Sequence, residues 1–247
     1  KPELEKIFAV VREEAPHTFL CANLGIVQLR DHGIEWAERA VEMIDAQAIA
    51  IHINSLQESI QPEGDHNAEG CLEALRNLCK EFSRPVIVKE TGSGISAETA
   101  RLIRGAGASA IDIGGHGGTS WAKIERLRAN GSDLADLGEA FLSWGIPTVV
   151  SLCEVRTVGG PIIATGGLRS GVDIAKAVAL GADLGGMALP LLKPAMESEE
   201  ALFAAVEAIH RELRVAMFLT GSRRPQDLRH TRAYITGLTR QMIEISD

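Results

Sequence analysis

Six short apolar runs alternate with longer amphipathic stretches along this chain. The runs are FLCANLG (19–25), AIAIHIN (48–54), PVIVKE (85–90), SAIDIGG (109–115), PIIATGG (161–167) and LGGMALP (184–190). The stretches between them include GIEWAERAVEMIDA (33–46), AEGCLEALRNLCKEF (68–82), SAETARLIRGAGA (96–108) and GVDIAKAVALGA (171–182). Strands that are apolar on both faces and separated by helices indicate βαβ units and a parallel sheet.

The apolar run IPTVVSLCEV (146–155) is predicted to be a helix. The next strand follows it within a few residues, whereas two adjacent parallel strands need a crossover of at least ~10 residues. We therefore predict a helix over 148–157. The chain from residue 197 on is helical and amphipathic, with a polar interruption at 220–227. No low-complexity tract or linker divides the sequence, which predicts one domain over 1–247.

Six βα units with glycine-rich strand ends predict an α/β fold of the TIM (β/α)8 barrel type, in which ligands bind at the carboxyl ends of the strands. Six strands are two fewer than this barrel has, so either two strands near the N-terminus escape this reading or they are absent from this chain. The alternative is a doubly wound open sheet with one ligand at a switch point. Polar residues follow almost every strand, which favours the barrel.

Composition limits the kind of partner. The 247 residues are 45% hydrophobic with a net charge of −8, which argues for a soluble protein and against a nucleic-acid partner. No apolar run approaches the ~20 residues that span a bilayer.

The charged start of the sequence lacks a signal peptide's apolar core and an initiator Met, so we expect a fragment of a longer chain. Cys21, Cys71, Cys79 and Cys153 have no C-x-x-C spacing, which predicts buried, reduced thiols in a cytoplasmic protein.

Glycine-rich turns follow the last two strands. Gly166 and Gly167 precede a helical pattern near Gly171, and GGMALPLL comes about twenty residues later. Glycine lets backbone N–H groups approach phosphate oxygens, and a helix N-terminus favours the negative charge. The two turns together predict a phosphate site of the kind that barrels build after their last strands. A simple reversal of the chain is the alternative.

Two further strand ends carry candidate ligand-binding residues. In GGHGGTSWAKIE (114–125), Thr119 or Ser120 either donates to a phosphate or caps a helix. Trp121 either covers an apolar ligand or packs in the core. Lys89 closes an apolar strand and needs an anionic partner, which is a ligand phosphate, an electron-rich cofactor ring or a structural salt bridge.

The stretch AIAIHINSLQE (48–58) combines a buried strand with a polar end. Strand alternation places His52 and Asn54 on the face opposite the three isoleucines, with Gln57 and Glu58 just beyond. Glu58 is an oxygen ligand of the kind that Mg²⁺ prefers, and Gln57 is suited to positioning a substrate. The alternative for His52 is a core histidine. Asn23 offers donor and acceptor groups at another strand end.

These segments resemble type 2 isopentenyl diphosphate isomerase, the flavin-dependent form. The resemblance is carried by VREEAP (11–16), ANLG (22–25), HINSLQESIQPEGD (52–65), VKETGSG (88–94), GGHGGTSW (114–121), WGIPT (144–148), ATGGLRSG (164–171) and MALPLL (187–192). It implies an FMN barrel that interconverts isopentenyl and dimethylallyl diphosphate. The family has further sequence before this chain's start, which supplies the first two barrel strands and further substrate contacts.

The resemblance also implies roles for individual residues. The flavin would be contacted by Asn23, Lys89 and Thr119, and its phosphate by Gly166, Gly167, Leu168, Arg169, Ala188 and Leu189. The substrate would be faced by His52, Asn54 and Gln57, with Trp121 near its tail and Glu58 holding Mg²⁺ against the diphosphate.

In this family the flavin is reduced, with NADPH as the expected reductant, although the reaction has no net redox change. The resemblance implies that the reduced flavin moves the protons, that Lys89 would stabilise its anionic form, and that the chain would assemble into tetramers or octamers. Two alternatives stay open from the residues. One is an FMN-dependent α-hydroxy-acid oxidase or dehydrogenase, which needs a His base followed closely by an Arg. The other is a non-catalytic flavin- or phosphate-binding barrel.

Overall fold

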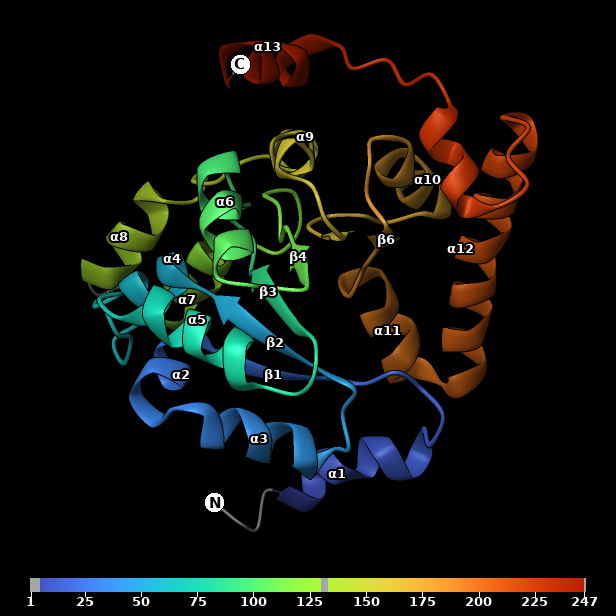
Figure 1. The fold of residues 1–247 in the computed structure, drawn as a ribbon. Helices are drawn as coiled ribbons and strands as arrows, with labels where there is room; N and C mark the ends of the chain where they lie inside the picture. Colours follow the sequence, from blue (N-terminus) through green and yellow to red (C-terminus); the bar gives the residue numbers. More distant parts are fainter. Residues whose placement is uncertain (1–4, 130–132, 247) are drawn as a thin grey trace.

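A parallel sheet of six strands, in the order β1-β2-β3-β4-β5-β6, forms the centre of the computed structural model, which describes residues 5–129 and 133–246 (Figure 1). The strands are β1 (Cys21–Gly25), β2 (Ala48–Ile53), β3 (Val86–Glu90), β4 (Ala110–Asp112), β5 (Ile162–Ala164) and β6 (Leu184–Gly185). Each strand lies inside one of the predicted apolar runs. The prediction of a parallel βα fold is confirmed.

Helices connect the strands and continue beyond the last one. They are α1 (Glu5–Glu14), α2 (Ile26–His32), α3 (Ile34–Met43), α4 (Ser55–Ile60), α5 (Cys71–Glu81), α6 (Ala97–Gly105), α7 (Trp121–Arg128), α8 (Asp133–Ala140), α9 (Thr148–Val158), α10 (Gly171–Ala179), α11 (Leu189–Glu197), α12 (Glu199–Leu219), the 3₁₀ helix η2 (Pro225–His230) and α13 (Gly237–Ser246). Helix α9 confirms the helix predicted over 148–157. In the described part of the chain, no helix is both long and apolar enough to cross a membrane.

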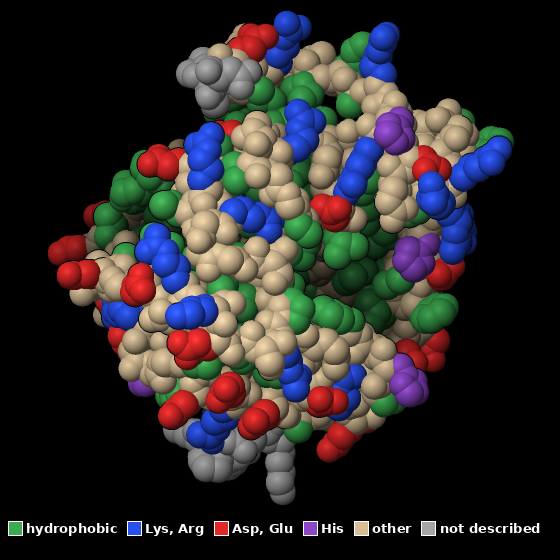
Figure 2. Space-filling view, viewed as in Figure 1, with side chains coloured by type: hydrophobic (Ala, Val, Ile, Leu, Met, Phe, Trp, Pro, Cys, Tyr) green, Lys and Arg blue, Asp and Glu red, His purple; other side chains and the backbone are tan. Residues whose placement is uncertain are grey.

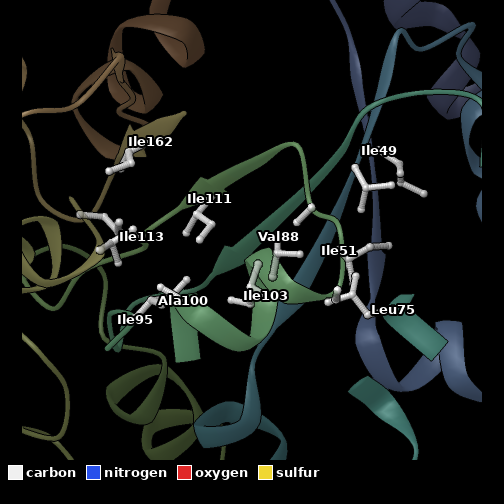
Figure 3. Close-up of a cluster of buried hydrophobic side chains, with 14 of the residues drawn as sticks. Ile49, Ile51, Leu75, Val88, Ile95, Ala100, Ile103, Ile111, Ile113 and Ile162 are labelled. Carbon is white, nitrogen blue, oxygen red and sulfur yellow. The ribbon is translucent and has the colours of Figure 1, made fainter. Parts of the chain in front are cut away.

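The main hydrophobic core lies between one face of the sheet and the helices α2, α3, α5, α6 and α9. Ile49 and Ile51 of β2 are fully buried on this face, as strand alternation predicts. Val88 of β3 faces Ala100 and Ile103 of α6 in the same cluster (Figure 3). Each buried valine or isoleucine side chain contributes roughly 1.5–3 kcal/mol, and an alanine less. This face therefore holds the sheet together and leaves the other face for polar side chains.

The opposite face of the sheet is open. Among the described residues, β1 and β6 each pair with one strand only, so the sheet has two edges where a closed barrel has further strands. Large apolar side chains are exposed near these edges, including Phe19 at 63% and Leu184 at 62%. Figure 2 shows hydrophobic side chains around a hollow on the side of the molecule where α11 lies.

Two sequence predictions are wrong in detail. The last strand was expected over 184–190, but β6 ends at Gly185 and Leu189 begins α11. Pro190 explains the early helix, because proline is favoured in the first turn, where its missing N–H costs no hydrogen bond. Cys71 and Cys153 are buried as predicted, whereas Cys79 is only half-buried and Cys21 is exposed on the open face.

Candidate active site

A row of side chains crosses the open face near the carboxyl ends of the strands. Strand register places His52 opposite Gly25 and Lys89, and Asp112 opposite Lys89 and Ile163. Residues in register on neighbouring strands project to the same face. His52, Lys89 and Asp112 accordingly line one cavity of about 950 Å³. Polar groups from three adjacent strands thus meet in one space.

Most of the predicted site residues line this cavity. Its walls include Asn23, His52, Gln57, Lys89, Thr119, Trp121, Gly166, Gly167, Leu168, Arg169, Ala188 and Leu189. Asn54 and Glu58 are not among the lining residues and lie just behind His52 and Gln57. The walls also include Glu90, Asp112 and Thr165, which the sequence analysis did not select.

His52 is held as a neutral imidazole beside β1. Its Nδ1 lies 3.3 Å from Oδ1 of Asn23. A side chain at Gly25 would come within 3.2 Å of Nε2, so glycine leaves room for the ring. Burial, and then the charge of Lys89, lower the pKa of His52. A neutral histidine keeps one N–H to donate and one nitrogen to accept.

Lys89 and Asp112 form the charged centre of the row. Burial raises the pKa of Asp112, while a hydrogen bond from the Thr165 hydroxyl and the charge of Lys89 oppose that rise. The Lys89 ammonium lies 3.3 Å from the carbonyl oxygen of Glu90. No carboxylate oxygen of the described residues lies within 4.0 Å of this ammonium. A structural salt bridge therefore does not account for Lys89, and its charge is available to a ligand.

Two glycine turns pack against each other at the far wall of the cavity. Gly167 has φ +85°, and a Cβ there would lie 2.1 Å from the carbonyl oxygen of Gly117. The guanidinium of Arg169 donates to the carbonyl oxygens of Gly167 at 2.9 Å and Gly117 at 3.1 Å. Thr148 Oγ1 donates to the carbonyl oxygen of Gly166 at 2.5 Å. These contacts fix the backbone of both turns at the cavity wall.

The first turn of α11 borders the same wall. Ala188, Leu189 and Pro190 line the cavity at the N-terminus of this nine-residue helix. Backbone N–H groups at a helix N-terminus attract anions, and here the Leu189 N–H serves, since Pro190 has none and the Leu191 N–H donates to the Ala188 carbonyl at 3.0 Å. The glycine turns and this helix end together suit a phosphate group.

Helices α4 and α7 bring Gln57 and Trp121 to another part of the wall. Gln57 Nε2 donates to Oε1 of Glu125 at 3.1 Å. Trp121 begins α7, is 37% exposed and lines the cavity, so it is not a core tryptophan. Ser120 caps α7 by accepting from the Lys123 N–H at 3.3 Å, which matches the helix-cap alternative for that residue.

Asn54 and Glu58 pair with each other behind the cavity. Asn54 is 8% exposed, and its Nδ2 donates to Glu58 Oε1 at 2.7 Å. Glu58 Oε2 accepts from Gln61 Nε2 at 2.7 Å and from the Asp65 backbone N–H at 3.1 Å. A carboxylate has about four acceptor positions, so one is left on Oε1.

Metal ligands are sparse in the part of the chain that the structure covers. No three His, Cys, Asp or Glu side chains converge there on one point. Mg²⁺ is usually held by one or two carboxylates together with water and substrate phosphates. A single open position on Glu58 fits that mode of binding and does not fit a site built from protein ligands alone.

The fold and the cavity define a flavin-type βα barrel. Residues 32–235 match the family described as FMN-dependent dehydrogenase. A lactate oxidase structure from Pediococcus acidilactici superposes with a TM-score of 0.68 at 20% identity, over 91% of this chain and 63% of that one. A mandelate oxidase variant superposes with a TM-score of 0.65 at 22% identity, over 94% and 67%. These two likenesses concern the fold alone.

Curated relatives narrow the family. An isopentenyl-diphosphate delta-isomerase from Methanoregula boonei is 63% identical over 98% of this chain and 69% of its own length. The enzyme of that name from Archaeoglobus fulgidus is 48% identical over 96% and 68%. The chain belongs to the isopentenyl-diphosphate delta-isomerase family, in its FMN-dependent form, and this confirms the resemblance drawn from the sequence. It spans about two thirds of the length of these relatives.

Proposed function

We propose that this chain interconverts isopentenyl and dimethylallyl diphosphate with reduced FMN and Mg²⁺. The observation that carries the proposal is the single cavity, which joins a phosphate-binding wall, a free lysine charge and a polar wall of His52 and Gln57. Its volume of about 950 Å³ lies at the upper end of the ~300–1,000 Å³ that is typical of ligand sites.

The residues present fit FMN. Its phosphate would be held by the two glycine turns and the start of α11, that is Gly166, Gly167, Leu168, Arg169, Ala188 and Leu189. Asn23, Lys89 and Thr119 would contact the ring. When bound and reduced, FMN supplies an electron-rich ring that exchanges protons and stabilises positive charge developing on the alkene. The Lys89 ammonium would stabilise the negative charge of that ring.

The remaining walls fit the diphosphate substrate. His52 would face the substrate, and Asn54 would support the adjacent Glu58 through its hydrogen bond to Oε1. Glu58 would bind Mg²⁺ through its one open acceptor position and so link the metal to the diphosphate. Gln57 would orient the alkene, and Trp121 would cover the apolar tail and exclude water.

The oxidase alternative finds less support at this site. His116 follows β4, and Thr119 stands where a His-x-x-Arg pair would need its arginine. His116 is not among the described residues that line the cavity, and its backbone N–H donates to the Ile146 carbonyl at 2.9 Å. The loop after β4 therefore lacks the His-x-x-Arg pair in which the histidine would take the proton and the arginine would bind the substrate carboxylate.

An anaerobic assay tests the proposal. The chain is incubated with FMN, NADPH, Mg²⁺ and isopentenyl diphosphate, and the dimethylallyl isomer is measured by proton NMR. Its appearance, dependent on NADPH and Mg²⁺, is the expected result. Oxygen consumption with a 2-hydroxy acid would favour the oxidase, and flavin binding without either reaction would favour a non-catalytic barrel. Size-exclusion chromatography with light scattering tests the further proposal of a tetramer or octamer, and a single cooperative melting transition is the expected result for one domain.

A further inference from the structure

Glu125 is a buried carboxylate directly behind the cavity wall. It is 2% exposed and belongs to α7, four residues after Trp121. Its Oε2 accepts from the Arg128 guanidinium at 2.7 Å, and its Oε1 accepts from Gln57 Nε2 at 3.1 Å. Arg128 also pairs with the exposed Glu63 at 2.9 Å. A charged side chain is rarely buried without paired partners, and here one of the two partners is a cavity residue.

The hydrogen bond to Glu125 determines which end of the Gln57 amide faces the cavity. An ionised carboxylate only accepts hydrogen bonds, so Gln57 must turn its NH₂ group toward it. No described residue donates to Gln57 Oε1, and Gln57 lines the cavity. The reverse orientation would place the amide oxygen against the carboxylate and leave buried acceptors unpaired, at a cost of about 1–3 kcal/mol.

We propose that Glu125 is a positioning residue that fixes the Gln57 amide with its carbonyl oxygen toward the substrate. The inference rests on the proposed isomerase function. Protonation of the terminal alkene carbon leaves positive charge on the tertiary carbon, and loss of an allylic proton removes that charge. A fixed amide oxygen, which carries partial negative charge, stabilises this charge where it develops. An NH₂ group in the same place would oppose it.

The substitution Glu125→Gln tests the orientation. Arg128 then donates to the new amide oxygen, and the new NH₂ group donates to Gln57, which must present its oxygen to it. The Gln57 NH₂ group is thereby turned toward the cavity. We expect kcat to fall roughly 10- to 100-fold with KM changed by less than about threefold, because only the charged transition state senses the change. Glu63→Gln is the matched control, since it breaks the exposed pair of Arg128 and leaves the Glu125–Gln57 bond; we expect kcat near wild type.

The exchange variant, Gln57→Glu with Glu125→Gln, supplies the rescue. The amide at position 125 donates to one oxygen of the new carboxylate, and the second oxygen faces the cavity again. We expect kcat at least about tenfold above that of Glu125→Gln. Equal kcat for Glu125→Gln and Glu63→Gln, or no gain in the exchange variant, would overturn the proposal.

A double-mutant cycle separates positioning from a packing role. Gln57→Met removes both ends of the amide, so adding Glu125→Gln should cause no further loss of kcat; a further loss of the full size would contradict the proposal. If Glu125→Gln fails to fold in the wild-type background, Gln57→Met with and without Glu125→Gln still measures any loss of kcat that does not act through the Gln57 amide. FMN binding and Tm are measured for every variant. If the wild type forms product and the variants have the same kcat as the wild type, this inference alone is overturned. If the wild type forms no product, the proposed function is overturned and the inference with it.

Discussion

The glycine turn of the phosphate wall offers a sharp test through Gly167→Ala. Gly167 has φ +85°, and its missing Cβ would lie 2.1 Å from the Gly117 carbonyl oxygen. Gly159, at the end of α9, has φ +84°, and a Cβ there would meet nothing within 4 Å. The two positions share nearly the same φ and differ in the close contact. Gly159→Ala is therefore the matched control.

The two substitutions differ in how far they move the backbone. Each places a side chain at positive φ, which costs about 1–3 kcal/mol of folding free energy. At Gly167 the turns must also separate by about 0.9 Å before the Cβ···O distance reaches the 3.0 Å that real Cβ atoms keep. A shift of that size lengthens a 2.9 Å hydrogen bond to phosphate beyond the usual limit. Each charge-assisted bond lost costs about 1.5–3 kcal/mol, or roughly 10- to 100-fold in Kd.

FMN titration by fluorescence quenching, together with thermal melting, measures both effects. We expect Gly159→Ala to lower Tm and leave the Kd for FMN within about twofold of wild type. Gly167→Ala should lower Tm and also raise the Kd for FMN at least about tenfold. Equal FMN affinity in the two variants would show that the turn holds no phosphate or that it adapts without loss.

Three further predictions concern the polar walls. Burial and Lys89 lower the pKa of His52, so its NMR titration midpoint should lie below about 6.5. The folded state then binds fewer protons than the unfolded state, so stability should fall as pH drops through that range, and His52→Gln should flatten this dependence. Lys89→Met should raise the His52 midpoint and weaken FMN binding or lower its reduction potential; an unchanged flavin titration and potential would contradict the role given to Lys89. Glu58→Gln should lower the Mg²⁺-dependent rate at least about tenfold and leave FMN bound, whereas a colourless protein would argue against a metal role.

Strand alternation was sufficient to predict much of the site. It placed His52 opposite the buried isoleucines of β2, and Lys89 at a strand end, without any knowledge of the neighbours. The glycine turns were predicted for a similar reason, because glycine has no Cβ and is therefore the residue that allows positive φ and close approach of the backbone. These patterns involve residues that are close together in the sequence, so they can be recognised without a structure.

Asp112 and Glu125 were missed because their importance depends on distant neighbours. Alternation puts Asp112 on the polar face of its strand, but the register that sets it beside Lys89 depends on how two strands pair. Glu125 lies 68 residues from Gln57, and only the packing of α7 against α4 brings them together. The predicted end of β6 was wrong for a different reason. In a short apolar run, a strand and the first turn of a buried helix have the same hydrophobic pattern, so the helix that begins at Leu189 was taken for strand.

Charge explains why the row on the open face is arranged as it is. A lone ammonium on a sheet face is costly to desolvate, and a carboxylate nearby lowers that cost. Asp112 lies opposite Lys89 on the neighbouring strand, and the charge of Lys89 favours the ionised form of Asp112. On the other side of Lys89, burial and then the charge of Lys89 lower the pKa of His52, so the row carries one cation, one carboxyl group and one ring that favours its neutral form. A second cation at His52 would bind a diphosphate more strongly but would withdraw charge from an electron-rich ring beside it. A neutral His52 would instead leave Lys89 as the one positive charge of the row, where the proposed reduced flavin ring needs it.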